Sequence, residues 1–449
     1  MKATVIGGGL AGCEAAWTLA NAGVAVTLYE MKPTRFSPAH KSVGLAELVC
    51  SNSLKARRLE SAAGLLKEEM RRLGSLCMQV ADTCAVPAGG ALAVDRDAFS
   101  SGMTAAIEAH PLITVLREEC TAIPEDGVVV IASGPLTSDA LAEKLTTLCG
   151  EGLHFYDAAA PIVEADSVDM NAAFTASRYG REEGDREGVS EGDYINCPMN
   201  KEEYEAFWEA LVTAERAPLH EFEQNEQPTV YEGCMPIEVL ASRGKDAIRF
   251  GPMKPVGLRD PRTGHRPWAV LQLRAENREG TLRNLVGFQT NLKFPEQKRV
   301  FGMIPALKNA QFVRYGVMHR NTFLNAPNLL DARFSFKAEP RLFFAGQMTG
   351  VEGYMESASS GILAGLNAVA MLKGYEPFIP QPDTMMGALA HYISGYEGKD
   401  FQPMGANFGV LPPIEPHIRD KKLRYEALSM RGLASLEATK AAHPLFDKK

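Results

Sequence analysis

The chain has 449 residues, of which 45% are hydrophobic and 23% are charged, and its formal net charge is −8. This composition is typical of a globular protein, the length favours two domains, and the negative charge argues against indiscriminate nucleic-acid binding. No apolar run approaches the roughly 18 residues that a membrane span needs. We therefore expect no membrane association.

The eight cysteines form no CxxC pair and no zinc-type grouping. A chain of this length needs no disulfide framework, so we expect reduced thiols, no metal site and a cytoplasmic location. The N-terminal residues lead directly into an expected strand, which leaves no room for a signal peptide.

The start of the chain predicts a strand, a glycine turn, a helix and a second strand. Residues 3–6 are apolar and β-prone, residues 13–22 have helical composition, and residues 24–29 form the second expected strand, which ends at Glu30. Because the glycine turn lies between a strand and a helix, it matches a Rossmann-type dinucleotide-binding fingerprint. Its residues are Gly7, Gly8, Gly9, Leu10, Ala11 and Gly12.

Each part of the fingerprint has an expected task. Gly7 allows the tight turn, Gly9 lets backbone amides approach a pyrophosphate, and Gly12 permits close helix–strand packing. The helix N-terminus offers free N–H groups to the phosphates. Glu30 is expected to accept hydrogen bonds from the ribose hydroxyls, and it disfavours a 2′-phosphate. The bound nucleotide should therefore be FAD or NAD rather than NADP.

Two later segments favour FAD. Residues 127–135 form a buried apolar strand that ends in a turn at Gly134, and residues 341–347 form another such strand ending at Gly346 and Gln347. A glycine-rich, helix-like run that includes Gly353 follows. These resemble the elements of two-domain flavoproteins that return to FAD from the far end of the chain. In those flavoproteins the last of these strands usually ends in Gly-Asp, whereas here it ends in Gly346-Gln347. The contact that the aspartate makes with the ribityl chain of the flavin is therefore not carried over to Gln347.

This arrangement predicts an α/β fold with a discontinuous Rossmann-like FAD domain. Residues 1–157 and 318–449 are expected to form that domain, and residues 158–317 a smaller inserted α+β domain. The insertion is more charged than its flanks. It includes a stretch with excess positive charge, in which Arg259, Arg262 and Arg266 are candidates for binding an RNA backbone. The alternative is a solvated loop whose charges pair with the acidic residues before it.

Two cysteines stand in unusual surroundings. Cys234 lies in the sequence YEGCMPIE at residues 231–238, where glycine and proline indicate a turn that can present a thiol. Cys50 lies in ELVCSNSLK at residues 47–55, in a region that commonly approaches the flavin in this fold. Taken alone, each is equally consistent with a small buried residue. The chain has no CxxC and no second GxGxxG, which counts against an NAD(P)H disulfide reductase.

These motifs occur together with GPMKPVGL at residues 251–258 and VRYGVMHRN at residues 313–321. In this order and combination they resemble the folate- and FAD-dependent tRNA (uracil-5-)-methyltransferases, the TrmFO family, related to the GidA/MnmG flavoproteins. The resemblance extends from Val5 to about Leu428 and is far more specific than the glycine fingerprint.

The resemblance implies methylation of the T-loop uridine of tRNA at C5, with methylenetetrahydrofolate as carbon donor, reduced FAD as cofactor and NADH or NADPH as reductant. It implies that Cys234 adds to C6 of the uracil as a nucleophile, and that Cys50 removes the C5 proton or assists near the flavin. Further candidates for contacts with folate or RNA are Trp268, Arg274, His319, Arg320 and Asn321. The alternative for each is a structural role.

Other functions remain open from the sequence. The same chemistry on a ribosomal RNA uridine is one, and wobble-uridine modification of the GidA/MnmG type is another. That family carries an extended C-terminal helical region, whereas this chain ends soon after the expected FAD domain. A flavin-bound RNA-binding or folding factor without turnover is a third. No stable protein partner is predictable.

Overall fold

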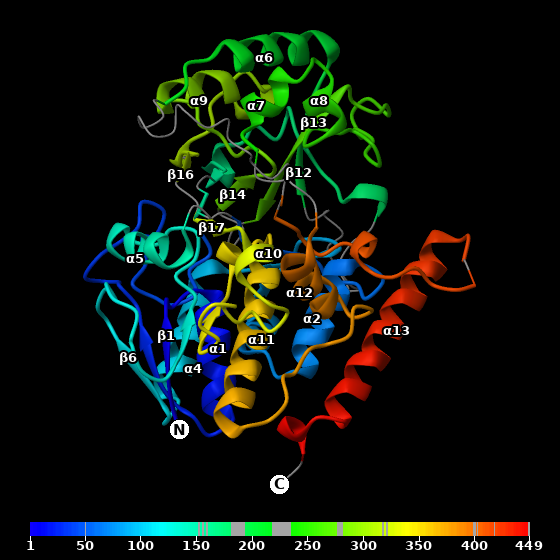
Figure 1. The fold of residues 1–449 in the computed structure, drawn as a ribbon. Helices are drawn as coiled ribbons and strands as arrows, with labels where there is room; N and C mark the ends of the chain where they lie inside the picture. The colour runs from blue at the N-terminus through cyan, green and yellow to red at the C-terminus, as the bar shows by residue number, and fades with distance from the viewer. Residues whose placement is uncertain are drawn as a thin grey trace.

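The computed structural model describes residues 1–49, 51–150, 153–154, 157–158, 160–180, 194–217, 235–275, 282–316, 318–319, 322–397, 401, 403–416 and 418–447. Two sheets organise these residues, one in each half of the molecule (Figure 1).

The lower half in Figure 1 is built on a parallel sheet with the strand order β18-β7-β1-β2-β6. Its strands are β1 (Lys2–Ile6), β2 (Ala25–Tyr29), β6 (Ile113–Leu116), β7 (Val128–Ile131) and β18 (Leu342–Phe344). The side chains of β7 are buried throughout, as expected for a parallel strand covered on both faces. The chain reaches β7 from β6 by crossing over β2 and β1. The strand order therefore changes direction beside β1, where ligands bind in open α/β sheets.

Helices cover this sheet and extend away from it. They are α1 (Leu10–Asn21), α2 (Ala62–Arg72), α3 (Leu76–Thr83), α4 (Arg96–Ala109), α5 (Asp139–Cys149), α10 (Ala326–Leu329), α11 (Tyr354–Lys373), α12 (Met385–Gly395) and α13 (Lys421–Ala441). Helices α1 and α11 pack so closely that a Cβ atom on Gly361 would lie 2.1 Å from the Ala11 carbonyl oxygen. This contact joins the beginning of the chain to its distal end. A three-stranded sheet beside them contains β3 (Ser53–Ala56), β4 (Ala85–Val86) and β5 (Ala91–Val94).

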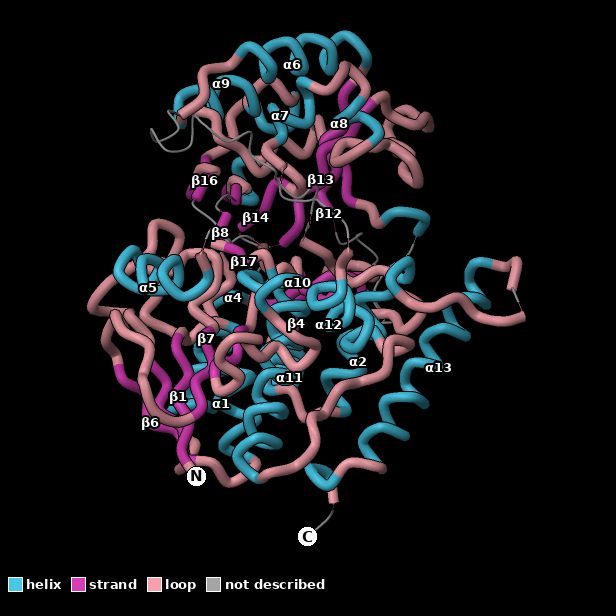
Figure 2. The backbone as a smooth tube through the Cα atoms, viewed as in Figure 1, coloured by secondary structure: helices cyan, strands magenta, loops and turns pink. Residues whose placement is uncertain are grey.

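The upper half contains an antiparallel sheet with helices above it, as Figure 2 shows by colour. Its strands follow the order β11 (Phe174–Thr175), β12 (Tyr194–Met199), β13 (Ala269–Ala275), β14 (Leu282–Leu285), β10 (Ile162–Glu164) and β15 (Phe312–Arg314). The helices are α6 (Lys201–Thr213), α7 (Ile237–Ser242), α8 (Ala247–Phe250) and α9 (Phe294–Phe301). The fold is thus α/β with a Rossmann-like sheet and an inserted α+β part, as the sequence predicts.

Two short strand pairs lie where the chain enters and leaves the insertion. Strand β8 (Leu153–His154) pairs with β17 (Phe323–Leu324), and β9 (Asp157–Ala158) pairs with β16 (Met318–His319). One hydrophobic cluster draws on residues 3–149 and 324–436, and a second on residues 163–310. The boundaries 1–157, 158–317 and 318–449 stay a prediction, which the separation of these clusters supports.

Within the described part of the chain, no helix combines the length and apolar character that crossing a membrane requires. The same residues hold no group of three or more His, Cys, Asp or Glu side chains arranged to bind a metal ion.

Candidate nucleotide cleft and catalytic segments

A cleft opens at the carboxyl ends of β1, β2 and β7, where the order of the parallel strands changes direction. Most of the predicted cofactor residues line it, namely Gly7, Gly8, Gly9, Leu10, Ala11, Glu30, Gly134, Gly346 and Gln347. Gly12 and Gly353 are not among its lining residues. The structure therefore brings together segments from three distant parts of the sequence.

The glycines of the turn have distinct surroundings. Gly7 has a φ of 106°, which L side chains rarely adopt. A Cβ atom on Gly12 would lie 1.8 Å from the Gly7 carbonyl oxygen, so only glycine lets α1 approach β1 this closely. A Cβ atom on Gly9 would have no heavy atom within 4 Å. Gly9 precedes the first turn of α1 and lines the cleft together with Leu10 and Ala11, so the N-terminus of this helix lies at the cleft.

Glu30 is buried at the end of β2 and is fixed by backbone donors. The Gly8 N–H donates to one carboxylate oxygen at 3.1 Å, and the Lys32 N–H donates to the other at 3.0 Å. The carboxylate therefore holds the glycine turn while it lines the cleft. This position suits a group that accepts hydrogen bonds from a ribose.

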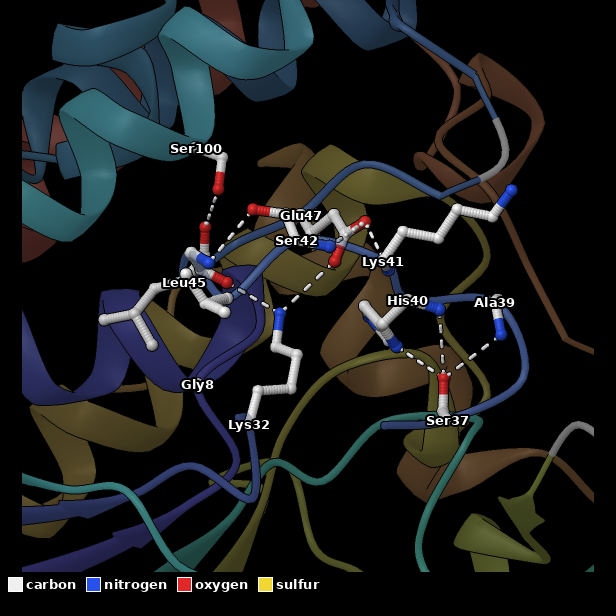
Figure 3. Close-up of polar contacts among 12 residues, drawn as sticks. Gly8, Lys32, Ser37, Ala39, His40, Lys41, Ser42, Leu45, Glu47 and Ser100 are labelled. Carbon is white, nitrogen blue, oxygen red and sulfur yellow. Dashed lines mark hydrogen bonds and ion pairs between the residues drawn. The ribbon is translucent and has the colours of Figure 1, made fainter. Parts of the chain in front are cut away.

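The loop that follows β2 also lines the cleft. Figure 3 shows its polar contacts. The buried Lys32 ammonium donates to the Gly44 carbonyl at 2.6 Å and lies 3.3 Å from a Glu47 carboxylate oxygen. The other oxygen of Glu47 accepts the N–H groups of Lys41 and Ser42 at 2.9 and 3.1 Å. Sequence reasoning missed Lys32 as a lining residue, because no motif marks residues 31–46, and it singled out the segment 47–55 for Cys50 rather than for Glu47.

The segment between β18 and α11 lines the cleft from the distal part of the chain. The Gly346 N–H donates to the Ser360 hydroxyl at 2.7 Å, and the Gln347 side chain donates to Glu352 at 3.2 Å. Tyr354, the first residue of α11, also lines the cleft. Gly353 directly precedes this helix with a φ of 125°, which L side chains rarely adopt, so the turn into α11 requires a glycine there.

The predicted catalytic residues Cys50 and Cys234 lie outside the described residues, as do Arg320 and Asn321. For His319 the structure describes only the backbone, which pairs with Asp157 between β16 and β9. The roles expected for these five residues stay predictions. The described residues next to each cysteine nevertheless carry specific contacts.

The segment after Cys50 is bound to the end of β13 in the inserted part. The Arg274 guanidinium donates from Nε to Asn52 Oδ1 at 3.0 Å and from Nη2 to the Ser51 hydroxyl. The buried Asn52 side chain donates back to the Ala275 carbonyl at 2.6 Å. The Ser51 N–H donates to the hydroxyl of Tyr354 at 3.1 Å. Arg274 thus fixes the segment between the inserted sheet and the cleft.

This network predicts the effect of replacing Arg274 with alanine. The change leaves Asn52 Oδ1 buried without its donor, which should lower the free energy of unfolding by about 1–3 kcal/mol. Arg274→Lys keeps the charge but not the two-atom contact, so its free energy of unfolding should lie between those of the intact protein and Arg274→Ala. Arg259→Ala is the control, because that arginine is exposed and should change stability by less than about 0.5 kcal/mol. Urea unfolding checks this, and equal effects of Arg274→Ala and Arg259→Ala would contradict it.

The residues after Cys234 are also anchored. The Ile237 N–H donates to the Gln289 carbonyl at 2.7 Å. The buried Glu238 carboxylate accepts the Thr290 hydroxyl at 2.8 Å and the Asn291 N–H at 2.7 Å. Burial raises the pKa of Glu238, and these hydrogen bonds oppose the rise. The contacts show that Glu238 holds the first turn of α7 to the loop after β14.

Trp268 lies outside the cleft lining and already has a partner on its ring. The Arg249 guanidinium carbon is 3.8 Å from the ring centroid, and Arg249 Nε donates to the Trp268 carbonyl at 3.1 Å. The indole N–H of Trp268 is buried without a hydrogen-bond partner among the described residues. Stacking on a pterin or base therefore stays a prediction for Trp268, and it would have to use a ring face that Arg249 leaves open.

Comparison with known proteins identifies the chain's relatives. A family described as "Glucose inhibited division protein A" matches residues 2–376. The methylenetetrahydrofolate–tRNA-(uracil-5-)-methyltransferase TrmFO of Geobacter sulfurreducens is 59% identical over 434 residues, which are 97% of this chain and 98% of that protein. The protein of the same name from Enterococcus faecalis is 57% identical over 433 residues, which are 96% and 97% of the two chains. The chain belongs to the TrmFO family.

The solved structures extend the comparison to the fold. Aquifex aeolicus GidA in its form II crystal has a TM-score of 0.70 at 16% identity, covering 98% of this chain and 73% of that one. Its form I crystal has a TM-score of 0.69, also at 16% identity, covering 99% and 77%. This chain therefore shares its fold with Aquifex aeolicus GidA. At this identity the likeness concerns the fold alone.

Proposed function

We propose that this chain methylates C5 of the T-loop uridine in tRNA, with methylenetetrahydrofolate as carbon donor and FAD as cofactor. The observation that carries the proposal is the 59% identity over 97% of the chain with a curated TrmFO. NADH or NADPH is the proposed reductant. The 57% identity to the Enterococcus faecalis TrmFO over 96% of the chain adds a second relative of the same name.

The cleft fits the adenosine and pyrophosphate parts of FAD. The open space at Gly9 and the N-terminus of α1 suit two phosphates, and the Glu30 carboxylate at the end of β2 suits a ribose. Gly346, Gln347 and Tyr354, which line the cleft from the distal part of the chain, are the residues proposed to contact the flavin end. Reduced FAD, when bound, supplies the electrons that turn the transferred one-carbon unit into a methyl group.

The proposed residue chemistry begins with the Cys234 thiolate. Its sulfur forms a bond to C6 of the uracil, and the electron pair of the C5–C6 double bond moves to C5 and its carbonyl as an enolate. C5 then forms a bond to the methylene carbon of the folate, as one carbon–nitrogen bond of that carbon breaks and the nitrogen keeps the electron pair. Cys50 removes the proton from C5 while the second carbon–nitrogen bond breaks, which releases tetrahydrofolate and leaves an exocyclic methylene group on C5. A hydride, which reduced FAD would supply, converts this methylene group into the methyl group, the C5–C6 double bond re-forms, and Cys234 leaves as the thiolate. The uridine must be lifted from its stack to reach the site.

Arg274 and Asn52 support this scheme as positioning residues. They join the segment that begins directly after Cys50 to the inserted sheet, and Ser51 joins the same segment to Tyr354 at the cleft. The chain thus provides a hydrogen-bonded connection between the proposed RNA-facing part and the proposed flavin end.

A tRNA methylation assay tests the proposal. The purified protein is incubated with NADH, methylenetetrahydrofolate and an unmodified tRNA transcript, and the digested RNA is analysed for 5-methyluridine. We expect 5-methyluridine in this transcript, and none in a matched transcript whose T-loop uridine is replaced by cytidine. Product only with a ribosomal RNA fragment would move the target to that RNA. No product with either RNA would contradict the proposal.

A further inference from the structure

A second pocket lies on the inserted part, where the loop after α8 meets the end of β11. Its lining residues are Ala176, Ser177, Gly257, Leu258, Arg259, Gly264, His265 and Arg266. Figure 1 shows the loop that follows α8 at the outer edge of the upper half, on the side away from α5. Because Thr137, Ser138 and Leu141, at and just before the start of α5, line the nucleotide cleft, and no described residue lines both pockets, the second pocket is separate from the cleft.

The loop of this pocket has a defined shape. Leu258 is buried with Phe174 and Val270 in a small apolar cluster, which anchors the loop to β11 and β13. The Asp260 N–H donates to the His265 carbonyl at 3.0 Å, and the Gly264 N–H donates to the Asp260 carbonyl at 2.8 Å. These contacts turn the chain so that residues on both sides of the turn line one pocket.

The charged residues near the pocket form two groups: Asp260 and Arg262 neutralise each other, whereas Arg259 and Arg266 line the pocket. Arg262 donates to both carboxylate oxygens of Asp260, from Nε at 3.0 Å and from Nη2 at 2.7 Å, and this pairing lowers the pKa of Asp260. Arg262 also donates to the Asn171 carbonyl. The lining carries no carboxylate among the described residues, whereas Arg259 and Arg266 are exposed and line it. The pocket therefore keeps an excess of positive charge.

We infer that this pocket, which Arg259, His265 and Arg266 line, binds a backbone phosphate of the RNA substrate. Guanidinium groups bind phosphate through paired hydrogen bonds, and a concave site holds a single phosphate better than an open surface does. The inference rests on the proposed function, because it takes RNA as the substrate. Since the pocket lies apart from the cleft, the bound phosphate belongs to a nucleotide other than the one that reacts.

The test compares a double variant, Arg259→Ser with Arg266→Ser, with the intact protein. The affinity for an unmodified tRNA transcript is measured between about 50 and about 200 mM salt. Loss of one phosphate contact should make the slope of log affinity against log salt shallower by roughly 0.7–0.9. Binding at the lowest salt should weaken about tenfold. Replacing both arginines by lysine should retain most of the slope.

The matched control removes two positive charges from the opposite end of the molecule, by Lys2→Ser with Lys373→Ser at the start of β1 and the end of α11. It should leave affinity and slope unchanged. The inference would be overturned if the intact protein and the Arg259→Ser, Arg266→Ser variant, with equal FAD content and melting temperature, gave equal slopes. It would also be overturned if the Lys2→Ser, Lys373→Ser control lost as much affinity and slope as the arginine variant. If the intact protein binds tRNA through this pocket but forms no 5-methyluridine, the proposed function fails while the pocket stands.

Discussion

Replacing Cys234 with alanine is expected to lower the rate of tRNA methylation by about 10⁴-fold or more, because C5 of uracil is a poor nucleophile until a thiolate has added to C6. FAD content should not change, since all the described residues that line the cleft lie in other segments of the chain. The measurement is the single-turnover rate of 5-methyluridine formation, with the FAD content read from the visible spectrum of the same sample.

Cys149→Ala provides the matched control for the loss of a thiol. Cys149 ends α5, and burial raises its pKa to about 11, so it remains a protonated thiol at neutral pH. The control should methylate tRNA at the rate of the intact protein. A Cys234→Ala variant that keeps even a tenth of that rate would remove Cys234 from the mechanism.

Replacing Gly9 with valine is expected to reduce FAD affinity by more than about tenfold while the protein still folds. A Cβ atom at Gly9 meets no heavy atom within 4 Å, so the side chain costs the fold little. It would instead occupy the space in front of the α1 N-terminus, where the pyrophosphate is expected. Fluorescence titration of the FAD-depleted protein with FAD gives the affinity, and circular dichroism gives the melting temperature.

Gly90→Val controls for adding the same side chain at an open glycine. A Cβ atom at Gly90 also meets nothing within 4 Å, and Gly90 is not among the lining residues of the cleft. FAD affinity should be unchanged in this variant. Unchanged FAD affinity in Gly9→Val would mean that the phosphates do not lie at the start of α1.

The nucleotide cleft could be predicted from the sequence because its determinants are local. The turn from Gly7 to Gly12, with an apolar strand on one side and helical composition on the other, specifies the strand–turn–helix unit without knowledge of any distant contact. The apolar run before Gly346 could also be predicted as a strand of the same sheet, because a buried apolar run followed by small residues is typical of a parallel strand.

The contacts around the predicted catalytic segments could not be predicted in this way. Asn52 and Arg274 are 222 residues apart in sequence, and no local pattern indicates that they meet. The sequence offered Arg274 as a folate or RNA contact, whereas the structure shows its guanidinium bound to Ser51 and Asn52. The contacts of Glu238 with Thr290 and Asn291, which lie 52 and 53 residues further along the chain, likewise have no local sequence signal.

The source of the transferred carbon tests the central claim most directly. The protein is incubated with unmodified tRNA, NADH and methylenetetrahydrofolate that carries ¹⁴C in its methylene group, and in parallel with S-adenosylmethionine that carries ¹⁴C in its methyl group. The account predicts labelled 5-methyluridine from the folate alone. Label that enters the tRNA from S-adenosylmethionine, and not from the folate, would contradict it.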